Sequence, residues 1–138
     1  MKNKSWYNDY RKKVVMKKFL KCPICGKIVE VINDTNVPLM CCGKPMEELV
    51  ANTTDAAVEK HVPVVDENND IVTITVGETL HPMTEEHYIM WIYVFTNKSE
   101  YHFDLKPNDN PSVTFTKSNN EEILEVYAYC NLHGLWKK

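Results

Sequence analysis

Cys130 and His133 stand three residues apart near the C-terminal end of the chain, in the stretch YAYCNLHGLWKK. Thiolate and imidazole are both good ligands for transition metals, and the C-x-x-H spacing lets one ion reach both side chains. Two ligands do not make a site, so further donors must come from elsewhere. The chain offers eight other candidates: His61, His81, His87, His102, Cys22, Cys25, Cys41 and Cys42.

The four remaining cysteines gather in two short segments, CPICG and CCGKPM. Cys22 and Cys25 form a C-x-x-C loop that directs two thiolates at one centre, and the adjacent Cys41 and Cys42 can supply two more. Neighbouring side chains of a strand point to opposite faces, so the backbone must turn there, which Gly43 makes easier. Four thiolates favour a closed tetrahedral site for zinc or a single iron, and spacing alone does not distinguish these metals. Such a site is structural or transfers electrons, because no position is left for a substrate.

Disulfides are the alternative use of these cysteines. A bridge between Cys41 and Cys42 would be a strained ring, and five cysteines would leave one thiol over. No apolar h-region follows the N-terminal positive charges, so no export signal is indicated and we expect a reducing cytoplasm, where metal binding is the better use of thiols. No apolar run approaches the roughly 18 residues of a membrane span. With 43% hydrophobic and 25% charged residues, the composition is that of a soluble globular protein without a membrane partner.

Charge is unevenly distributed along the chain. Residues 1–21 hold eight Lys or Arg against one Asp, a net charge of +7, and since the whole chain carries −3, residues 22–138 carry −10. We expect residues 1–18 to be a mobile, solvated basic extension because they show no hydrophobic periodicity. Met16 is an alternative start of the protein. Contact with nucleic acid or a membrane through this extension is the competing interpretation.

The segments that position these residues differ on the two sides of residue 50. Before it, Gly and Pro crowd the cysteines around one short strand, KIVEVI, and so small a unit needs a bound ion to fold. Residues 51–60 predict a linker with a helical turn, capped by Asn52 or Thr53 and ended before Pro63. The rest predicts short antiparallel strands at hairpin spacing, with a turn at DENND, and therefore a β-sandwich or barrel.

The histidines differ in their surroundings. His61 and His81 are expected at strand edges beside prolines, and His87 opens the strand HYIMWIYVF. Strand ends of a β-sandwich can gather ligands from distant parts of a chain. His102 lies inside the alternating run YHFDL and is expected to be an ordinary surface residue.

Five motifs, in the order CPICG, CCGKPM, EKHVPV, HPMTEEHYIMWI and YCNLHGLWK, resemble those of desulfoferrodoxin, the two-iron form of superoxide reductase. The resemblance covers about residues 19–138 and leaves out the N-terminal extension. It implies a mainly β protein, with a desulforedoxin-like metal knuckle at 19–50 followed by an immunoglobulin-like antiparallel β-sandwich at 51–138. It also implies a homodimer.

The resemblance also implies which residues bind two iron ions. Cys22, Cys25, Cys41 and Cys42 match the ligands of an Fe(Cys)4 centre, in which zinc can substitute. The catalytic iron is matched by four equatorial imidazoles and an axial thiolate: His61, His81, His87, His133 and Cys130. Glu59 and Lys60 match residues beside the open sixth position, with Glu59 a hypothetical sixth ligand of the ferric ion and Lys60 a positive charge that attracts superoxide.

The function implied is one-electron reduction of superoxide to hydrogen peroxide without release of dioxygen, with electrons from a donor such as rubredoxin. Two alternatives belong to other classes. An iron electron-transfer protein would need a saturated ion, whereas four imidazoles and one thiolate leave one position free. A zinc-ribbon nucleic-acid binder accounts for the first 45 residues only and gives no use for the histidines.

Overall fold

The computed structural model describes residues 17–138, which divide into two units at the chain boundary between Leu49 and Val50. The predicted basic extension lies outside the described residues, except for its last two positions. Lys18 already belongs to the first strand, β1.

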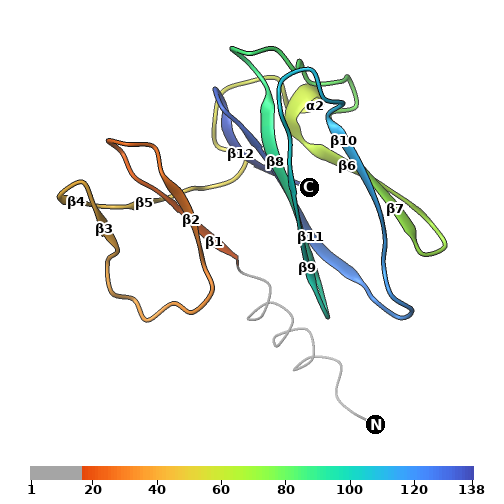
Figure 1. Ribbon diagram of the computed structural model, residues 1–138, viewed down its shortest axis with the longest axis horizontal. Coiled ribbons are helices and arrows are strands. Elements are labelled where there is room, and N and C mark those ends of the chain that lie inside the picture. The colour runs from red at the N-terminus through yellow and green to blue at the C-terminus, as the bar shows by residue number, and fades with distance from the viewer. Residues whose placement is uncertain (1–16) are drawn as a thin grey trace, which may run out of the picture. The chain divides into compact units, whose positions relative to one another are not determined.

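The first unit is a small knuckle of short strands (Figure 1). Its central strand β1 (Lys18–Lys21) pairs antiparallel with β2 (Ile28–Val31) and β5 (Glu47–Glu48), and β3 (Met40–Cys41) forms a hairpin with β4 (Lys44–Pro45). Among its described residues only Phe19, Leu20 and Cys22 are buried. This core is as small as the sequence predicts, and the expected strand KIVEVI is present as β2.

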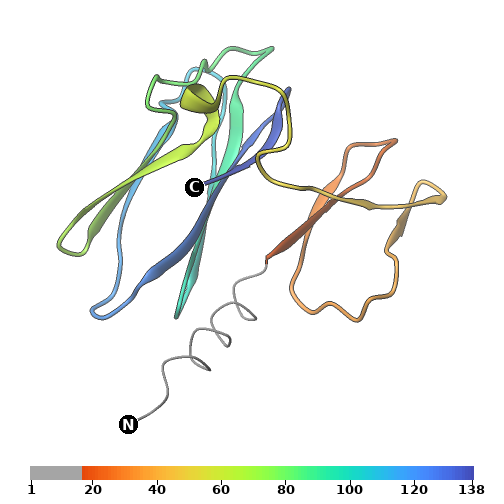
Figure 2. The same ribbon diagram turned by 180° about the vertical axis from the view of Figure 1, so that it is seen from behind.

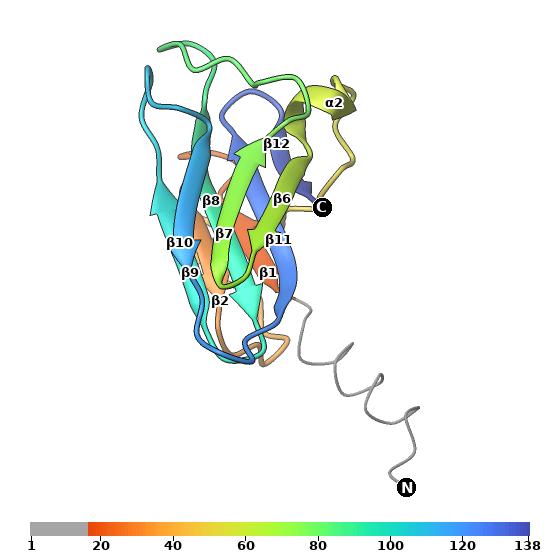
Figure 3. The ribbon, with the colours of Figure 1, turned by 90° about the vertical axis from the view of Figure 1, so that its right-hand side faces the viewer.

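The second unit is an antiparallel β-sandwich, as predicted, and Figure 3 shows its two sheets face to face. One sheet has the order β10-β7-β6 and the other β12-β11-β8-β9. The bounds are β6 (Pro63–Asn68), β7 (Ile71–Val76), β8 (Ile89–Thr96), β9 (Glu100–Asp104), β10 (Ser112–Thr116), β11 (Ile123–Cys130) and β12 (Gly134–Lys137).

Alternation along the strands builds the core between the sheets. In β7, Val72, Ile74 and Val76 point inward and are fully buried, whereas Thr73 and Thr75 face outward and bond to hydroxyl groups of β10. The opposite sheet contributes the other buried members of the cluster: Ile89, Ile92, Val94, Val126, Ala128 and Cys130. Cys130 therefore lies in the apolar core with its sulfur at one end of the sandwich.

That end also carries the short helix α2 (Val58–His61) and the loop that joins β7 to β8 (Figure 2). The predicted helical turn is present, but the predicted cap is wrong: Ala57 precedes the helix without a side-chain cap. Asn52 instead bonds to β12. His61 ends the helix rather than standing at a strand edge.

In the second unit, two strands differ from the expected pattern. β6 continues through most of DENND, because Asn69, with φ of 55°, and Asp70 suffice for the hairpin turn. β12 was not expected, because a four-residue strand after a tight turn has too little sequence pattern to recognise.

Candidate metal centres

Two hairpin-like turns position the cysteines of the knuckle. After β1, the Cys22 carbonyl accepts a hydrogen bond from Gly26 N at 3.1 Å, which closes the C-x-x-C loop. Between β3 and β4, Cys42 and Gly43 form a two-residue turn with φ of 52° and 73°. The predicted turn at the adjacent cysteines is thus confirmed, and it carries Cys41 and Cys42 toward the first pair.

The sulfur atoms of the knuckle have the spacing of a tetrahedral metal site. Cys25 Sγ lies 3.7 Å from Cys41 Sγ, which lies 4.0 Å from Cys42 Sγ. A tetrahedron with metal–sulfur bonds of about 2.3 Å has sulfurs about 3.8 Å apart. The structure contains no disulfide among its five cysteines.

The thiols of the knuckle affect one another's ionisation. The backbone N–H groups of Cys25 and Ile24 each donate a hydrogen bond to Cys22 Sγ at 3.4 Å. These bonds, that of Cys25 most strongly, lower the pKa of Cys22 to about 6. Hydrogen bonding to Cys22 and Cys25 raises the pKa of Cys41 to about 12. One thiolate therefore forms readily, and its negative charge disfavours ionisation of the next thiol. A bound cation would remove this repulsion.

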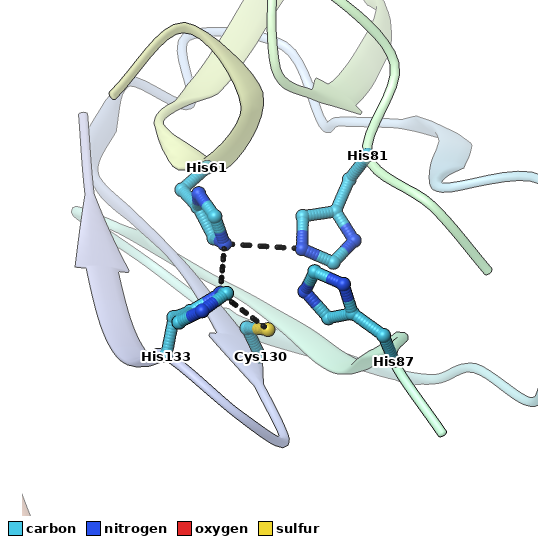
Figure 4. Close-up of side chains that lie close together, drawn as sticks. All are labelled: His61, His81, His87, Cys130 and His133. Carbon is cyan, nitrogen blue, oxygen red and sulfur yellow. Dashed lines mark hydrogen bonds between the residues drawn. The ribbon is translucent and has the colours of Figure 1, made fainter. Parts of the chain in front are cut away.

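Three separate segments bring the histidines and Cys130 together (Figure 4). His61 ends α2, His81 lies in the loop after β7, His87 precedes β8, and Cys130 and His133 flank the turn into β12. The donor atoms of these five residues all lie within 4.8 Å of one another.

The four imidazole rings form a closed cycle. Adjacent rings in the order His61, His81, His87, His133 have centroids 4.5–4.9 Å apart and planes 76–84° from one another. His61 and His87 stand across the cycle at 6.2 Å. Cys130 Sγ lies 3.8 Å from His133 Nδ1. Four nitrogens and one sulfur thus share a single centre.

Backbone carbonyls fix which nitrogen each buried ring turns inward. His61 Nδ1 donates to the Ala57 carbonyl at 2.7 Å, and His81 Nδ1 donates to the Pro82 carbonyl at 2.6 Å. Both rings therefore direct an unprotonated Nε2 at the centre. His87 Nε2 is buried and has no hydrogen-bond partner among the described residues.

Burial keeps these histidines neutral. Desolvation lowers the pKa of His61 and His87 and lowers that of His81 to about 4. Converging lone pairs without protons are unfavourable in a dry site unless a cation lies between them. Three imidazole Nε2 atoms, one Nδ1 and one thiol sulfur are the donor types that iron accepts, so the residues fit a metal ion.

Glu59 and Lys60, in α2, are both exposed and directly precede His61. The positive charge of Lys60 adds to the lowering of the pKa of His61 and His87. His102 lies outside the cluster, as predicted: its ring stacks on Tyr93 and its Nε2 lies 3.0 Å from Asp104.

Three neighbours of the cluster escaped sequence reasoning. Trp136 stacks on His61, and Asn131 bonds to both residues that flank His87. Gly77 allows α2 to pack on the His81 loop, because a Cβ there would lie 2.7 Å from the Lys60 carbonyl oxygen. Trp136, close after the C-x-x-H motif, was a visible signal, but its contact with His61 depends on the fold.

Sequence comparison places the chain among known proteins. The Desulfoferrodoxin family profile matches residues 53–138, and the profile of the desulfoferrodoxin N-terminal domain matches residues 15–49. A desulfoferrodoxin of Syntrophotalea carbinolica is 48% identical over 116 residues, 84% of this chain and 90% of that protein. A superoxide reductase of Pyrococcus abyssi is 33% identical over 57% of this chain and 84% of that protein.

Structural comparison agrees with the sequence. The crystal structure of the superoxide reductase from Treponema pallidum superposes with a TM-score of 0.74 at 33% identity, over 88% of this chain and 98% of that one. The superoxide reductase of Giardia intestinalis, described as a one-iron form, gives a TM-score of 0.50 at 34% identity, over 58% of this chain and 95% of that one.

Proposed function

The chain belongs to the desulfoferrodoxin family, and we propose that it is a superoxide reductase that converts superoxide to hydrogen peroxide at the histidine and Cys130 cluster. The convergence of five donor atoms within 4.8 Å supports this proposal most strongly. Reduction of superoxide consumes one electron and two protons and releases no dioxygen. An iron ion at this cluster would supply the electron and one free coordination position for the anion.

The proposal assigns metal binding to two sets of side chains. His61, His81, His87, His133 and Cys130 hold the catalytic iron. Cys22, Cys25, Cys41 and Cys42 hold a second iron, or zinc in its place.

The chain's own residues prepare the catalytic site for an anion. Carbonyl groups hold His61 and His81 with unprotonated nitrogens inward, so these rings remain ligands at neutral pH. Lys60 attracts superoxide locally, against the net charge of −10 over residues 22–138. The exposed carboxylate of Glu59, two residues before His61, would be the candidate sixth ligand of an oxidised metal ion.

The knuckle and the sandwich have different tasks in this proposal. Residues 19–50 form an electron-transfer or structural unit, residues 51–138 form the catalytic domain, and residues 1–18 are a basic extension. Electrons come from a one-electron carrier such as rubredoxin. Five cysteines without disulfides support a reducing cytoplasmic location. The described residues contain no helix long and apolar enough to span a membrane.

We also propose a homodimer. Large apolar side chains of the knuckle are exposed, among them Ile32 at 89% and Val37 at 74%, which supports a contact with a second copy. Sedimentation equilibrium would measure the mass of the particle in solution, and a monomer at micromolar concentration would contradict this part of the proposal.

Pulsed superoxide tests the reaction. The iron-loaded, reduced protein is mixed with a known amount of superoxide, and peroxide and dioxygen are measured together. A reductase yields one peroxide per superoxide and no dioxygen, whereas a dismutase yields dioxygen. An electron carrier reacts slowly and yields the products of spontaneous dismutation.

Two variants make the test specific to the cluster. His81→Ala removes a proposed ligand and should abolish the fast reaction. His102→Ala removes an exposed histidine outside the cluster and should leave it intact. Equal activity of both variants would refute the proposed site.

A further inference from the structure

Trp136 contacts two members of the histidine cluster at once. Its indole ring stacks on His61 with centroids 4.7 Å apart and planes 27° from parallel. Its Nε1–H donates a hydrogen bond to the backbone carbonyl of His133 at 3.1 Å. The residue is 1% exposed, so both contacts lie in a dry environment where they are strong.

The strand register makes these contacts possible. Trp136 in β12 pairs with Ala128 in β11, and Ala128 lies on the core side of the sheet. The indole therefore points inward under α2. Gly134, paired with Cys130, begins β12 directly after His133. The tight turn thus sets how far the indole lies from Cys130 and His133, the two ligands that flank the turn.

An asparagine of the linker holds the backbone on both sides of Trp136. Asn52 N donates to the Leu135 carbonyl at 3.0 Å. The Asn52 side chain accepts a hydrogen bond from Lys137 N at 2.8 Å and donates one to the Lys137 carbonyl at 2.9 Å. Asn52 thereby acts as a neighbouring strand for the exposed edge of β12.

We propose that Trp136, held by Asn52, is a positioning residue of the catalytic metal site: it sets the ring plane of His61 and the backbone position of His133. The inference rests on the proposed metal site and goes beyond the ligands themselves. His61 is already held at Nδ1 by the Ala57 carbonyl, and a single hydrogen bond leaves its ring free to rotate about that contact. The stacked indole removes this freedom.

The proposal predicts separate effects for the two contacts. Trp136→Phe keeps an aromatic ring against His61 but loses the N–H donor to His133. Trp136→Leu loses both. We expect Trp136→Leu to weaken ferrous or cobaltous ion binding at the histidine site by about tenfold, and Trp136→Phe to recover most of that loss.

Competition with a chelator of known affinity measures metal binding in the full-length protein. The reduction potential of the iron-loaded site provides a second readout, and we expect it to shift in Trp136→Leu. Phe115→Leu is the matched control, because Phe115 stacks on Tyr101 at 4.3 Å in the same sandwich and contacts no histidine of the cluster. It should lower stability without changing metal affinity or potential.

The possible outcomes separate positioning from mere packing. If Trp136→Leu retains both metal affinity and potential, or if Phe115→Leu shifts them equally, the positioning role is refuted. If Trp136→Leu does not fold, Asn52→Ala decides, since truncating an exposed side chain opens no large cavity: unchanged metal affinity and potential in that variant would overturn the proposal. Absence of metal binding by the unmodified protein would instead refute the proposed function.

Discussion

His61 and His81 direct their Nε2 atoms at each other across 3.1 Å, although each ring already donates its Nδ1 proton to a backbone carbonyl. Neither Nε2 then carries a proton for the other to accept. Two lone pairs at this distance repel, and both rings are at least 97% buried. The fold therefore holds the ligands ready before metal arrives, at a cost to the stability of the metal-free protein.

Gly77 is the residue that lets the two ligand-bearing segments approach. Its φ is 87°, and a Cβ there would overlap the Thr79 carbonyl oxygen and lie 2.7 Å from that of Lys60. We expect Gly77→Ala to lower the free energy of unfolding by more than about 2 kcal/mol and to weaken metal binding. Thermal unfolding and metal titration measure the two effects.

Gly134→Ala is the control for backbone strain. Its φ of 77° is similar, but the nearest atom to an added Cβ is Thr54 Oγ1 at 3.4 Å. A cost of about 1 kcal/mol is expected for it. An equal loss of unfolding free energy in both variants would show that the close approach at Gly77 does not affect stability.

Asn131 holds the backbone on both sides of His87, as Asn52 holds it on both sides of Trp136. Its Oδ1 accepts from Tyr88 N and its Nδ2 donates to the Glu86 carbonyl, both at 3.0 Å, so the two bonds flank His87. We expect Asn131→Ala to lower metal affinity at the histidine site by about tenfold, with Asn131→Asp intermediate because it keeps the acceptor. Chelator competition measures this affinity.

Asn97→Ala is the matched control for Asn131→Ala. Asn97 also accepts a backbone hydrogen bond, from Glu122 N at 2.9 Å, but it lies in the turn after β8, remote in sequence from every ligand. It should change metal affinity little. A similar loss in both variants would mean that metal binding responds to general destabilisation.

Glu121 is a buried carboxylate at the opposite end of the sandwich, and it gives stability a pH dependence. Burial opposes its ionisation, but hydrogen bonds from Thr96, Ser118 and Tyr101 outweigh this effect and lower its pKa to about 2 from 4.5. Because the folded-state pKa is the lower one, this stabilisation is complete above pH 4.5 and is lost as the pH falls toward 2.

Glu121→Gln tests this contribution. The free energy of unfolding of the variant should be lower by about 1–3 kcal/mol at neutral pH. Its difference from that of the unmodified protein should shrink below pH 4.5. Urea unfolding at a series of pH values measures it, and the comparison cancels metal loss common to both proteins. Asp66→Asn, at an exposed position of β6, should show no such trend. A difference that stays constant down to pH 2 would contradict the assignment.

The sequence predicted the donors of both centres because cysteine and histidine carry their chemistry in their type and spacing. The turn at Cys42 and Gly43 was predictable for the same reason: adjacent cysteines can serve one ion only if the backbone reverses there. The short β-rich runs at hairpin spacing likewise predicted a β-sandwich or barrel.

The supporting residues were beyond sequence reasoning because their roles depend on register. Asn52 has the residue type of a helix cap, and only the position of β12 shows that it bonds there instead. In the sequence, Trp136 cannot be told from any other apolar core residue. Only the position of its strand shows that it lies under His61. Local propensity is a weak guide wherever a long-range backbone contact competes with it.

Lys60 is predicted to accelerate capture of superoxide. A single positive charge beside the site raises the local concentration of an anion, and salt screens the effect. Lys60→Ala should lower the second-order rate by about tenfold at low ionic strength, with the two rates converging near 1 M salt, where the screening length is about 3 Å. Pulse radiolysis at several salt concentrations measures both. Lys98→Ala, in the turn after β8, should leave the rate and its salt dependence unchanged. If Lys60→Ala had the same salt dependence of the rate as the unmodified protein, a steering role of Lys60 would be excluded.

Cys25→Ser is predicted to separate the two metal centres. Loss of one sulfur from a set spaced 3.7–4.0 Å apart leaves an incomplete tetrahedron, so the knuckle should lose its ion. The catalytic donors all belong to the second unit, so its iron content and its rate with superoxide should remain close to those of the unmodified protein. Metal analysis of the purified variant and stopped-flow kinetics measure the two quantities. A folded variant that keeps the iron of the histidine site but no longer reduces superoxide would mean that the electron must pass through the knuckle.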